Sequence, residues 1–387
     1  MRKRRVILLG ATGSIGSSAI KVAETIPDRM QIVGMAANRN ARLLAQAANR
    51  ARPEAICLVD AAHLDELRSC LDYSPEILTG EVGLETLARM GGADLVLVAI
   101  VGTSGLRPAL AAIETGKDLA VASKEILVMA GETVMTQASQ KGIKVLPVDS
   151  EHNAIFQCLE GKPKHEISSL ILTASGGPFR KLSSDRLASV TVADALKHPT
   201  WKMGRKISID SATLFNKGLE MIEARWLFDI PMGQVQVLVH PQSIVHSMVE
   251  FVDGSLLAQL SHSDMCFPIQ YAVTWPERVP NALKPLRLAE LGRLEFEEPR
   301  YDDFPALRLA RQAGETGGTM PAVLNAANEI AVEAFLEGRI TFPQIWSLVE
   351  EAMNRSDNFA RPSLDDIIHA DGQARDVVRG HWRSNRI

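Results

Sequence analysis

The chain has 387 residues, 46% hydrophobic and 23% charged, enough for two or three domains with buried cores. Its formal net charge of -4 gives no electrostatic reason to expect nucleic acid or an anionic membrane as a partner. No apolar run approaches the ~18 residues that a membrane helix needs, and the four cysteines lack metal or redox spacing, so we expect a cytoplasmic protein with reduced thiols.

The first part of the chain alternates short β-rich runs with helical stretches. Strands are predicted at 5–9, 31–36, 55–59, 94–100, 118–122 and 142–147, and helices at 14–25, 42–50 and 108–114. Such an alternation implies a parallel sheet with helices on both faces. The sequence therefore predicts an α/β fold whose N-terminal domain, residues 1–149, holds a Rossmann-like parallel sheet and binds a dinucleotide.

The pattern changes after residue 150. Strand-like runs at 168–173, 235–239 and 244–251 are separated by long loops and by a helix near 218–227, which indicates a central α+β catalytic domain over 150–275. Five prolines suit a linker over 276–305. Helical apolar spacing in 321–336, followed by stretches at 345–353 and 363–378, predicts a small C-terminal helical domain over 306–387.

Three glycines, Gly10, Gly13 and Gly16, follow the first strand and open the first helix. Small residues let the backbone approach a pyrophosphate, which the helix N-terminus stabilises through its N–H groups and dipole. The spacing G-x-x-G-x-x-G departs from the strict G-x-G-x-x-G, so the alternative is a strand–helix turn without a ligand. The strand before it and the helix after it favour a dinucleotide.

The end of the second strand, Ala36-Ala37-Asn38-Arg39, indicates which dinucleotide binds. NAD-binding units usually place an acid here to hold the ribose 2′-OH, and this chain has none. Arg39 and Arg42 are instead available to a 2′-phosphate, which favours NADP. The alternative is that the two arginines belong to a solvated helix face.

Acidic residues follow the strand at 142–147. In extended backbone, Asp149 and Glu151 would point the same way and could meet one ion. If the chain is helical from about Ala212, Asn216 and Glu220 share one face, and Glu220 could be a third oxygen ligand. Carboxylates of this kind suit Mg²⁺ or Mn²⁺. The alternatives are exposed acids or helix caps for the first pair, and a surface ion pair with Arg225 for Glu220.

Two further motifs carry polar groups. The strand at 168–173 leads into Ser175-Gly176-Gly177, a turn that can present N–H groups to an anion, although Ser175 could simply cap the turn. His240 and His246 lie on one face of a strand-like segment. No third ligand has clear spacing for zinc, so hydrogen-bonded structural histidines are the favoured interpretation.

At these motifs the sequence resembles the 1-deoxy-D-xylulose 5-phosphate reductoisomerase family, over nearly the whole chain. The resemblance rests on residues 10–16, 124–125, 147–156, 174–180, 198–220, 239–248 and 325–338. It implies an NADP-dependent oxidoreductase of the non-mevalonate isoprenoid pathway. The enzyme would rearrange and reduce 1-deoxy-D-xylulose 5-phosphate, a phosphorylated ketose, to 2-C-methyl-D-erythritol 4-phosphate. It also implies NADPH and a divalent metal (Mg²⁺ or Mn²⁺, with Co²⁺ as a further option) as cofactors, and a homodimer.

The resemblance also implies roles for individual residues. The metal ligands would be Asp149, Glu151 and Glu220, and the catalytic residues Lys124, Glu151 and His198. A flap over about 198–204 would cover the substrate with its tryptophan. Substrate-binding positions would be Ser150, Glu151, Ser175, His198, Trp201, Met203, Ser211, Asn216, Lys217 and Glu220. Positions in contact with NADPH would be Gly10, Thr12, Gly13, Ser14, Ile15, Ala36, Ala37, Asn38, Arg39, Ser123, Glu125 and Gly204.

Three positions depart from the family pattern. Ser123 and Thr200 stand where asparagine is common, and Ala37 stands where lysine is common, which puts the usual contact with the 2′-phosphate in doubt. None of them removes a metal ligand.

The alternative function is a simple NADP-dependent aldehyde or semialdehyde dehydrogenase, which the N-terminal half alone permits and which would not need a metal. A non-catalytic NADPH sensor would instead predict a degraded second half.

Overall fold

The computed structural model describes residues 3–201 and 203–383, which fold as two compact units. The first is formed within Met1–Ile126, Glu132–Asn153 and Asp264–Pro285, and the second within Leu127–Gly131, Ala154–Ser263 and Leu286–Ile387. The α/β fold expected from the sequence is confirmed. The bounds of the three expected domains and of the linker between the second and third stay a prediction. Among the described residues, no helix combines the length and apolarity needed to cross a bilayer.

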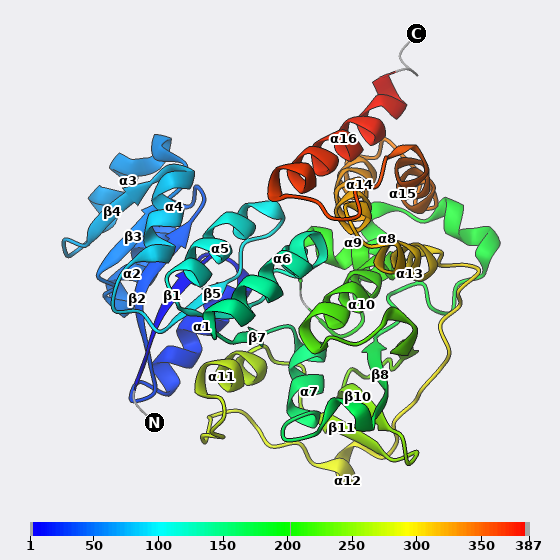
Figure 1. Cartoon of the computed structure of the whole chain (residues 1–387), viewed down its shortest axis with the longest axis horizontal. Coiled ribbons are helices and arrows are strands. Elements are labelled where there is room, and N and C mark those ends of the chain that lie inside the picture. Colours follow the sequence, from blue (N-terminus) through cyan, green and yellow to red (C-terminus); the bar gives the residue numbers. More distant parts are fainter. Residues whose placement is uncertain (1–2, 202, 384–387) are drawn as a thin grey trace. The chain divides into compact units, whose positions relative to one another are not determined.

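The first unit is built on a seven-stranded sheet in the order β4-β3-β2-β1-β5-β6-β7, with every neighbouring pair parallel (Figure 1). The order reverses at β1, so the ends of β1 and β5 form the switch point at which such sheets bind ligands. The strands are β1 (Arg4–Leu9), β2 (Met30–Ala37), β3 (Ala55–Leu58), β4 (Glu76–Thr79), β5 (Leu95–Val98), β6 (Asp118–Val121) and β7 (Val145–Pro147).

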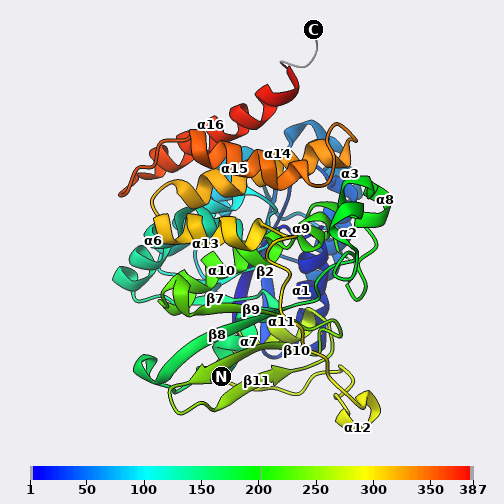
Figure 2. The ribbon, with the colours of Figure 1, turned by 90° about the vertical axis from the view of Figure 1, so that its right-hand side faces the viewer.

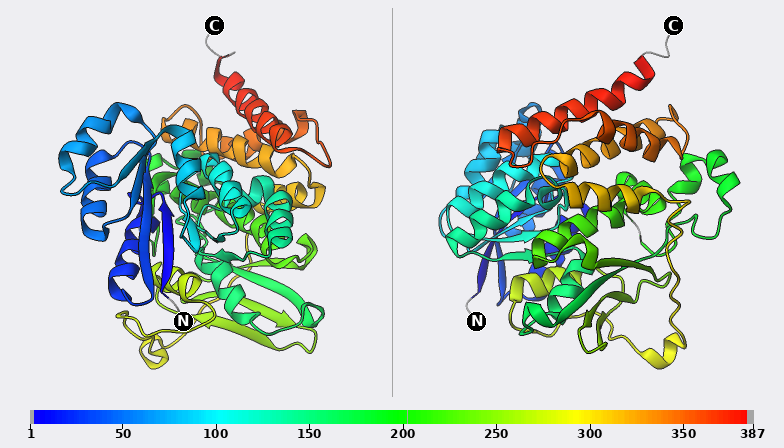
Figure 3. Two further views of the ribbon diagram at one scale, coloured as in Figure 1. Left: turned by 60° about the vertical axis from the view of Figure 1, so that its left-hand side comes forward. Right: turned by 45° about the vertical axis from the view of Figure 1, so that its right-hand side comes forward.

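Helices complete the first unit. They are α1 (Ser14–Thr25), α2 (Ala41–Ala51), α3 (Leu64–Cys70), α4 (Gly80–Arg89), α5 (Leu106–Glu114), most of α6 (Glu125–Lys141) and α11 (Cys266–Thr274). Although α11 comes late in the chain, it packs beside α1, as the left view of Figure 3 shows. Asn153 Nδ2 also donates to the carbonyls of Pro147 (2.9 Å) and Pro268 (3.2 Å), which ties α11 to the end of β7.

The second unit contains a four-stranded sheet in the order β11-β10-β8-β9, with β8 parallel to β9 and antiparallel to β10. Figure 2 shows α10 between this sheet and α13, and α14 between α13 and the pair α15 and α16. The elements are β8 (Ile167–Ala174), β9 (Val235–Val239), β10 (Val245–Phe251), β11 (Leu256–Leu260), α7 (Ser150–Cys158, shared with the first unit), α8 (Val192–Ala195), α9 (Arg205–Thr213), α10 (Phe215–Phe228), α12 (Leu288–Leu291), α13 (Ala306–Thr316), α14 (Met320–Leu336), α15 (Gln344–Arg355) and α16 (Leu364–Arg383).

Candidate active site

The glycine-rich turn is tied to the second strand, because the N–H groups of Gly10 and Ala11 both donate to the carbonyl of Ala36, at 3.0 and 2.8 Å. Gly10 has φ +94°, and a Cβ there would lie 2.2 Å from the carbonyl oxygen of Ala99. A Cβ on Gly16 would lie 2.3 Å from the carbonyl oxygen of Gly10. Gly13 differs, because its φ is -82° and the nearest atom to a Cβ is 3.5 Å away. Packing therefore requires two of the glycines, whereas the third, Gly13, has room for a Cβ in ordinary van der Waals contact and lines the cavity described next.

A cavity of about 300 Å³ lies at the carboxyl ends of the strands in the first unit. Six of the predicted cofactor residues line it: Gly10, Thr12, Gly13, Ala36, Ala37 and Asn38. Seven other lining residues were not predicted: Val59, Glu81, Leu84, Ala99, Ile100, Val101 and Ser104. Val59 and residues 99–101 follow or end strands that the sequence predicts, so strand topology could have identified them. Glu81 and Leu84 lie on α4, which the sequence reasoning missed.

The remaining predicted cofactor residues lie outside the cavity lining. Ser14 and Ile15 begin α1, and Arg39 is exposed just after β2. Arg42 is paired with Glu66 at 2.6 Å, which favours Arg39 of the two arginines as a partner for a 2′-phosphate. Ser123, just before α6, and Glu125, its first residue, are both buried, and Gly204 precedes α9 in the second unit. The Ser123 hydroxyl donates to the carbonyl of Ile100 at 2.6 Å, so Ser123 supports the cavity wall.

The acidic segment after β7 is helical, and the expectation of extended backbone there is wrong. The helix α7 begins at Ser150, and the carbonyl of Asp149 accepts a hydrogen bond from the N–H of Asn153 at 2.8 Å. An aspartate followed by serine and glutamate is typical of a helix N-terminus, which explains why the chain turns here. Oxygens of Asp149 and Glu151 nevertheless lie within 4.8 Å of each other, because both residues are at the same helix end.

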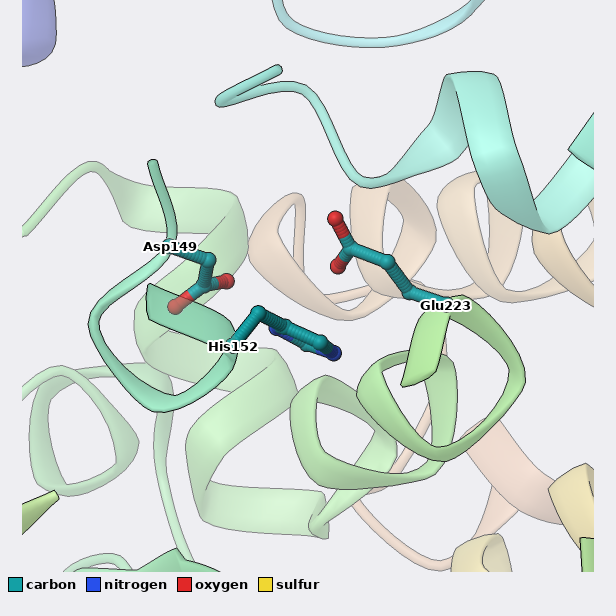
Figure 4. A group of neighbouring side chains, drawn as sticks. All are labelled: Asp149, His152 and Glu223. Atoms are coloured by element: carbon teal, nitrogen blue, oxygen red, sulfur yellow. The ribbon is translucent and has the colours of Figure 1, made fainter. Parts of the chain in front are cut away.

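Each of these two acids has a polar partner in the first unit. The Lys124 ammonium, 7% exposed, lies 2.6 Å from Asp149 Oδ2, and the Ser150 hydroxyl donates to Glu151 Oε2 at 2.5 Å. His152 is fully buried, and one of its ring nitrogens lies within 4.8 Å of an Asp149 oxygen (Figure 4). Figure 4 also draws Glu223, which belongs to α10 of the second unit. The sequence reasoning gave no role to His152, although it follows Glu151 directly.

In the second unit, a second polar cluster lies at the start of α10. The helix does not run on from Ala212 as expected: α9 ends at Thr213, Leu214 has φ +65°, and α10 begins at Phe215. Asn216 and Glu220 still share one face, and Asn216 Nδ2 donates to Glu220 Oε1 at 2.6 Å.

An ion pair completes the cluster at the start of α10. Lys217, 3% exposed, forms an ion pair with the fully buried Glu220. The pair of Glu220 with Arg225, considered as an alternative, does not form, because Arg225 bonds to the carbonyl of Gly314. The acid and the lysine therefore compensate each other's charge inside the protein.

The turn after β8 packs against the end of α9. Gly177 has φ +67°, and a Cβ there would lie 2.7 Å from the carbonyl oxygen of Ser211. Only glycine fits this approach, since it lacks a Cβ and tolerates positive φ. The second unit thus brings the turn of Ser175 to the α9–α10 junction, where Ser211, Asn216 and Lys217 lie.

His198 is held by hydrogen bonds to both ring nitrogens. Its Nδ1 accepts from the backbone N–H groups of Trp201 (2.9 Å) and Thr200 (3.2 Å). In the neutral ring the proton therefore lies on Nε2, which is 2.9 Å from the Ser175 hydroxyl oxygen. Burial lowers the pKa of His198 to about 4, so the ring is neutral at ordinary pH.

The Ser175 oxygen then accepts two hydrogen bonds, one from His198 and one from the N–H of Gly177 at 3.3 Å. Because these bonds occupy its lone pairs, its own proton is available to a ligand oxygen. Residues 198–201 and 203–204 form no helix or strand, and Met203 is half-buried. Lys202, within the predicted flap, lies outside the described residues.

His240, the first of the two histidines that the sequence places on one face, has contacts within the fold at both ring nitrogens. His240 is fully buried, its Nδ1 lies 2.8 Å from the carbonyl of Glu295, and its Nε2 accepts from the N–H of Ile244 at 3.2 Å. Its ring also stacks on Phe296 with centroids 4.7 Å apart. Both nitrogens of His240 are therefore used within the fold, in agreement with the structural interpretation.

Comparison with known proteins gives consistent matches. Family models match three parts of the chain: 1-deoxy-D-xylulose 5-phosphate reductoisomerase over 6–131, its C-terminal domain over 145–228, and the DXP reductoisomerase C-terminal domain over 260–377. The chain is 50% identical over 376 residues to the reductoisomerase of Pelotomaculum thermopropionicum, covering 97% of each protein. It is 51% identical over 382 residues to that of Symbiobacterium thermophilum, covering 97% of this chain and 98% of the other.

Solved structures agree with these matches. The Zymomonas mobilis reductoisomerase in complex with NADPH superimposes with a TM-score of 0.92 at 44% identity, covering 98% of this chain and 99% of that one. A DOX-P reductoisomerase in complex with NADPH, fosmidomycin and magnesium gives a TM-score of 0.91 at 40% identity, covering 97% and 98%.

A Rossmann-type sheet with a cavity at its switch point, joined to a second unit that buries acids such as Glu220 together with Lys217, is typical of NAD(P)-dependent oxidoreductases with a separate substrate domain. Within that class, the chain belongs to the 1-deoxy-D-xylulose 5-phosphate reductoisomerase family. The roles of individual residues stay predictions.

Proposed function

We propose that this chain converts 1-deoxy-D-xylulose 5-phosphate to 2-C-methyl-D-erythritol 4-phosphate with NADPH and a divalent metal ion, using the residues described above. The reaction is that of its family, whose relatives match it over nearly their whole length. The observation that carries the assignment of residues is the pair of lysine–carboxylate contacts, Lys124 with Asp149 and Lys217 with Glu220. Lysines and acids are rarely buried unless they are paired, and buried charged groups of this kind are enriched at functional sites.

NADPH would occupy the cavity of the first unit, as related enzymes have been crystallised with NADPH. Gly13 lines the cavity and carries no side chain, which leaves room for the pyrophosphate beside the N-terminus of α1. Arg39 would pair with the 2′-phosphate, because Ala37 offers no charge and Arg42 is already paired. Ser123 would act indirectly by fixing Ile100 in the cavity wall.

The residues present fit a hard divalent ion. Asp149, Glu151 and Glu220 supply only carboxylate oxygens, which Mg²⁺ prefers and Mn²⁺ or Co²⁺ also accepts. Each acid now has a lysine or hydroxyl partner, as expected of groups that must be compensated when buried. When bound, the ion polarises the substrate's carbonyl as a Lewis acid, and NADPH supplies the hydride.

The α9–α10 junction would hold the substrate's phosphate. Lys217 supplies positive charge, while Ser211 and Ser175 supply hydroxyl donors. The amide oxygen of Asn216 is buried and has no hydrogen-bond partner among the described residues, so it is suited to accept from a substrate hydroxyl. Binding energy from the phosphate would thus orient the reacting carbons.

His198 connects the flap to this junction. Its neutral ring holds the backbone of Trp201 and Thr200 while donating to Ser175. The flap is therefore positioned by the same side chain that orients a substrate-binding hydroxyl, and Trp201 with Met203 would exclude water from the reacting groups. Lys124, which is buried beside Asp149, would stabilise developing negative charge.

A simple aldehyde dehydrogenase is not favoured, because family models also match residues 145–228 and 260–377, outside the dinucleotide-binding sheet.

We further propose a homodimer. The edge strand β11 exposes Leu256 and Leu257, and Val252 beside it is 68% exposed. An apolar sheet edge of this kind is suited to pairing with a second copy. A cytoplasmic location is consistent with four free cysteines.

The direct test follows NADPH absorbance during incubation with 1-deoxy-D-xylulose 5-phosphate, with EDTA or with added Mg²⁺ or Mn²⁺. We expect oxidation only with metal, and an amount of methylerythritol phosphate equal to the NADPH consumed. Metal-independent oxidation of simple aldehydes would instead support the dehydrogenase. Absence of any metal-dependent oxidation would overturn the proposed function.

A further inference from the structure

We infer that Asn328, on α14 among the C-terminal helices, is a positioning residue for the substrate's phosphate. It would act through Asp210 on α9, the residue directly before Ser211. The inference rests on the proposed function, since it takes Ser211 as a phosphate donor. Four contacts within the second unit support it.

The first contact joins two fully buried side chains that are far apart in the sequence. Asn328 Nδ2 donates to Asp210 Oδ1 at 2.8 Å, and the two residues are 0% and 1% exposed. A hydrogen bond to a buried carboxylate is among the stronger ones, because it offsets the loss of water around the charge. Asp210 Oδ2 lies 2.8 Å from the Lys206 ammonium one turn earlier on α9. Asp210 is thus held from α14 on one side and from its own helix on the other.

The second contact fixes the donor itself. Glu329, the next residue on α14, pairs with Arg375 of α16 at 2.6 Å, and Arg375 is also bound to Asp371 at 2.7 Å. The amide of Asn328 therefore projects from a helix that α16 anchors at the neighbouring residue, Glu329. The amide oxygen of Asn328 accepts no hydrogen bond within the part of the chain that the structure describes. Burying an amide whose oxygen has no hydrogen-bond partner costs free energy. We therefore infer that Asn328 is retained for the hydrogen bond that its Nδ2 donates to Asp210.

The third and fourth contacts show why the position of α9 matters. The Thr213 hydroxyl accepts from the N–H of Phe215 at 3.3 Å and donates to the carbonyl of Asp210 at 3.1 Å. The turn of Gly177 packs on the carbonyl of Ser211. A shift of α9 would therefore move Ser211 relative to both Ser175 and Lys217. Asp210 is the residue of α9 that receives the hydrogen bond from Asn328, so loss of that bond would remove a restraint directly beside Ser211.

The chain offers a matched control on the same helix. Asn325 is also 0% exposed, but its Nδ2 donates to Glu329 within α14 at 3.3 Å. Asn325→Ala removes the same atoms as Asn328→Ala and leaves a similar cavity, without breaking a contact to α9. A loss of stability alone would affect the two variants alike.

The test is a double-mutant cycle on steady-state kinetics of the full chain with saturating metal. Asn328→Ala is expected to raise KM for the phosphorylated substrate about tenfold, the effect of one hydrogen bond to a charged group, with kcat and KM for NADPH changed less than twofold. Asn325→Ala should leave all three within twofold. Ser211→Ala should raise KM similarly, and adding Asn328→Ala to it should raise KM by less than twofold further, because both act on the same interaction.

The outcomes separate the inference from the proposed function. If Ser211→Ala leaves KM unchanged, the phosphate assignment is wrong. If Ser211→Ala raises KM while Asn328→Ala does not, or the two effects multiply, the positioning role is refuted. Should Asn328→Ala fail to fold, Asn328→Ser retains a shorter donor and is expected to raise KM about threefold. An unchanged KM in that variant, or an equal rise in Asn325→Ala, also overturns the inference.

Discussion

The three glycines of the first turn should separate stability from cofactor binding when each is replaced by alanine. In Gly16→Ala, the new Cβ would lie 2.3 Å from the carbonyl oxygen of Gly10 and 2.6 Å from backbone atoms of Ala11. These contacts are about 1 Å too short, and backbone atoms cannot rotate away, so overpacking of about 3 kcal/mol is expected. A gain of about 1 kcal/mol in helix propensity offsets part of it. The net loss of about 2 kcal/mol corresponds to a fall in Tm of about 4–8 °C.

Gly13→Ala should behave in the opposite way. The nearest atom to its new Cβ is 3.5 Å away and its φ of -82° suits any residue, so only the weaker helix cap, about 0.5–1 kcal/mol, is lost. The methyl group would occupy the approach to the N-terminus of α1, and we expect the Kd for NADPH to rise at least about tenfold.

The assays for this pair are thermal unfolding without cofactor and fluorescence titration with NADPH. Gly91→Ala, which adds a Cβ in open space, controls for the substitution itself. The reasoning is refuted if Gly13→Ala folds normally and binds NADPH with unchanged Kd. It is equally refuted if Gly16→Ala keeps the Tm of the parent.

Three other predictions follow from the site and the sheet edge. Glu220→Gln should raise the Mg²⁺ concentration for half-maximal turnover by more than the ~10–100-fold typical of outer-shell residues, measured by metal titration; an unchanged requirement would exclude Glu220 as a ligand. Burial lowers the pKa of His198 and of His246 from an ordinary 6.5 to about 4. As the pH falls, both histidines therefore become protonated in the unfolded chain at a higher pH than in the folded chain. The free energy of unfolding should consequently decrease as the pH drops from about 6.5 to about 4. His246→Gln should flatten that fall in urea unfolding, and an equally steep profile would contradict the assignment. Leu256→Lys should convert the proposed dimer to a monomer in sedimentation velocity, whereas an unaltered dimer would place the interface elsewhere.

The sequence predicted the strands that are buried on both faces and missed two exposed or half-buried edge strands, β4 and β11. β3 and β5 are continuous apolar runs with every side chain buried, and β1 ends in four buried apolar residues, which makes the strand pattern clear. β4 begins with an exposed glutamate and is half-buried throughout, as befits an edge strand, so its pattern is weak. Missing β4 also meant missing α4, and with it Glu81 and Leu84 of the cofactor cavity.

Residue spacing predicted side-chain contacts correctly within a helix, but it did not predict where helices begin and end. Asn216 and Glu220 are bonded as their separation by four residues predicts. The break at Leu214 could not be foreseen, because leucine rarely adopts positive φ and tertiary packing imposes it here. The same holds for Asp149 and Glu151, where the polar residues that suggested a metal site are also those that start a helix.

The sequence can indicate the residues proposed to bind the substrate, but it does not indicate the residue proposed to position them. Ser211 and Lys217 stand within one dense polar motif, so their types and spacing indicate a phosphate site without a structure. Asn328 lies more than a hundred residues later, in a segment whose apolar residues recur at helical spacing, and this context predicts only a buried helix. Its contact with Asp210 arises because α14 packs on α9. Burial then gives the contact its strength, since a carboxylate held away from water depends on each remaining donor. The C-terminal helices thereby contribute to the geometry of the site as well as to the core.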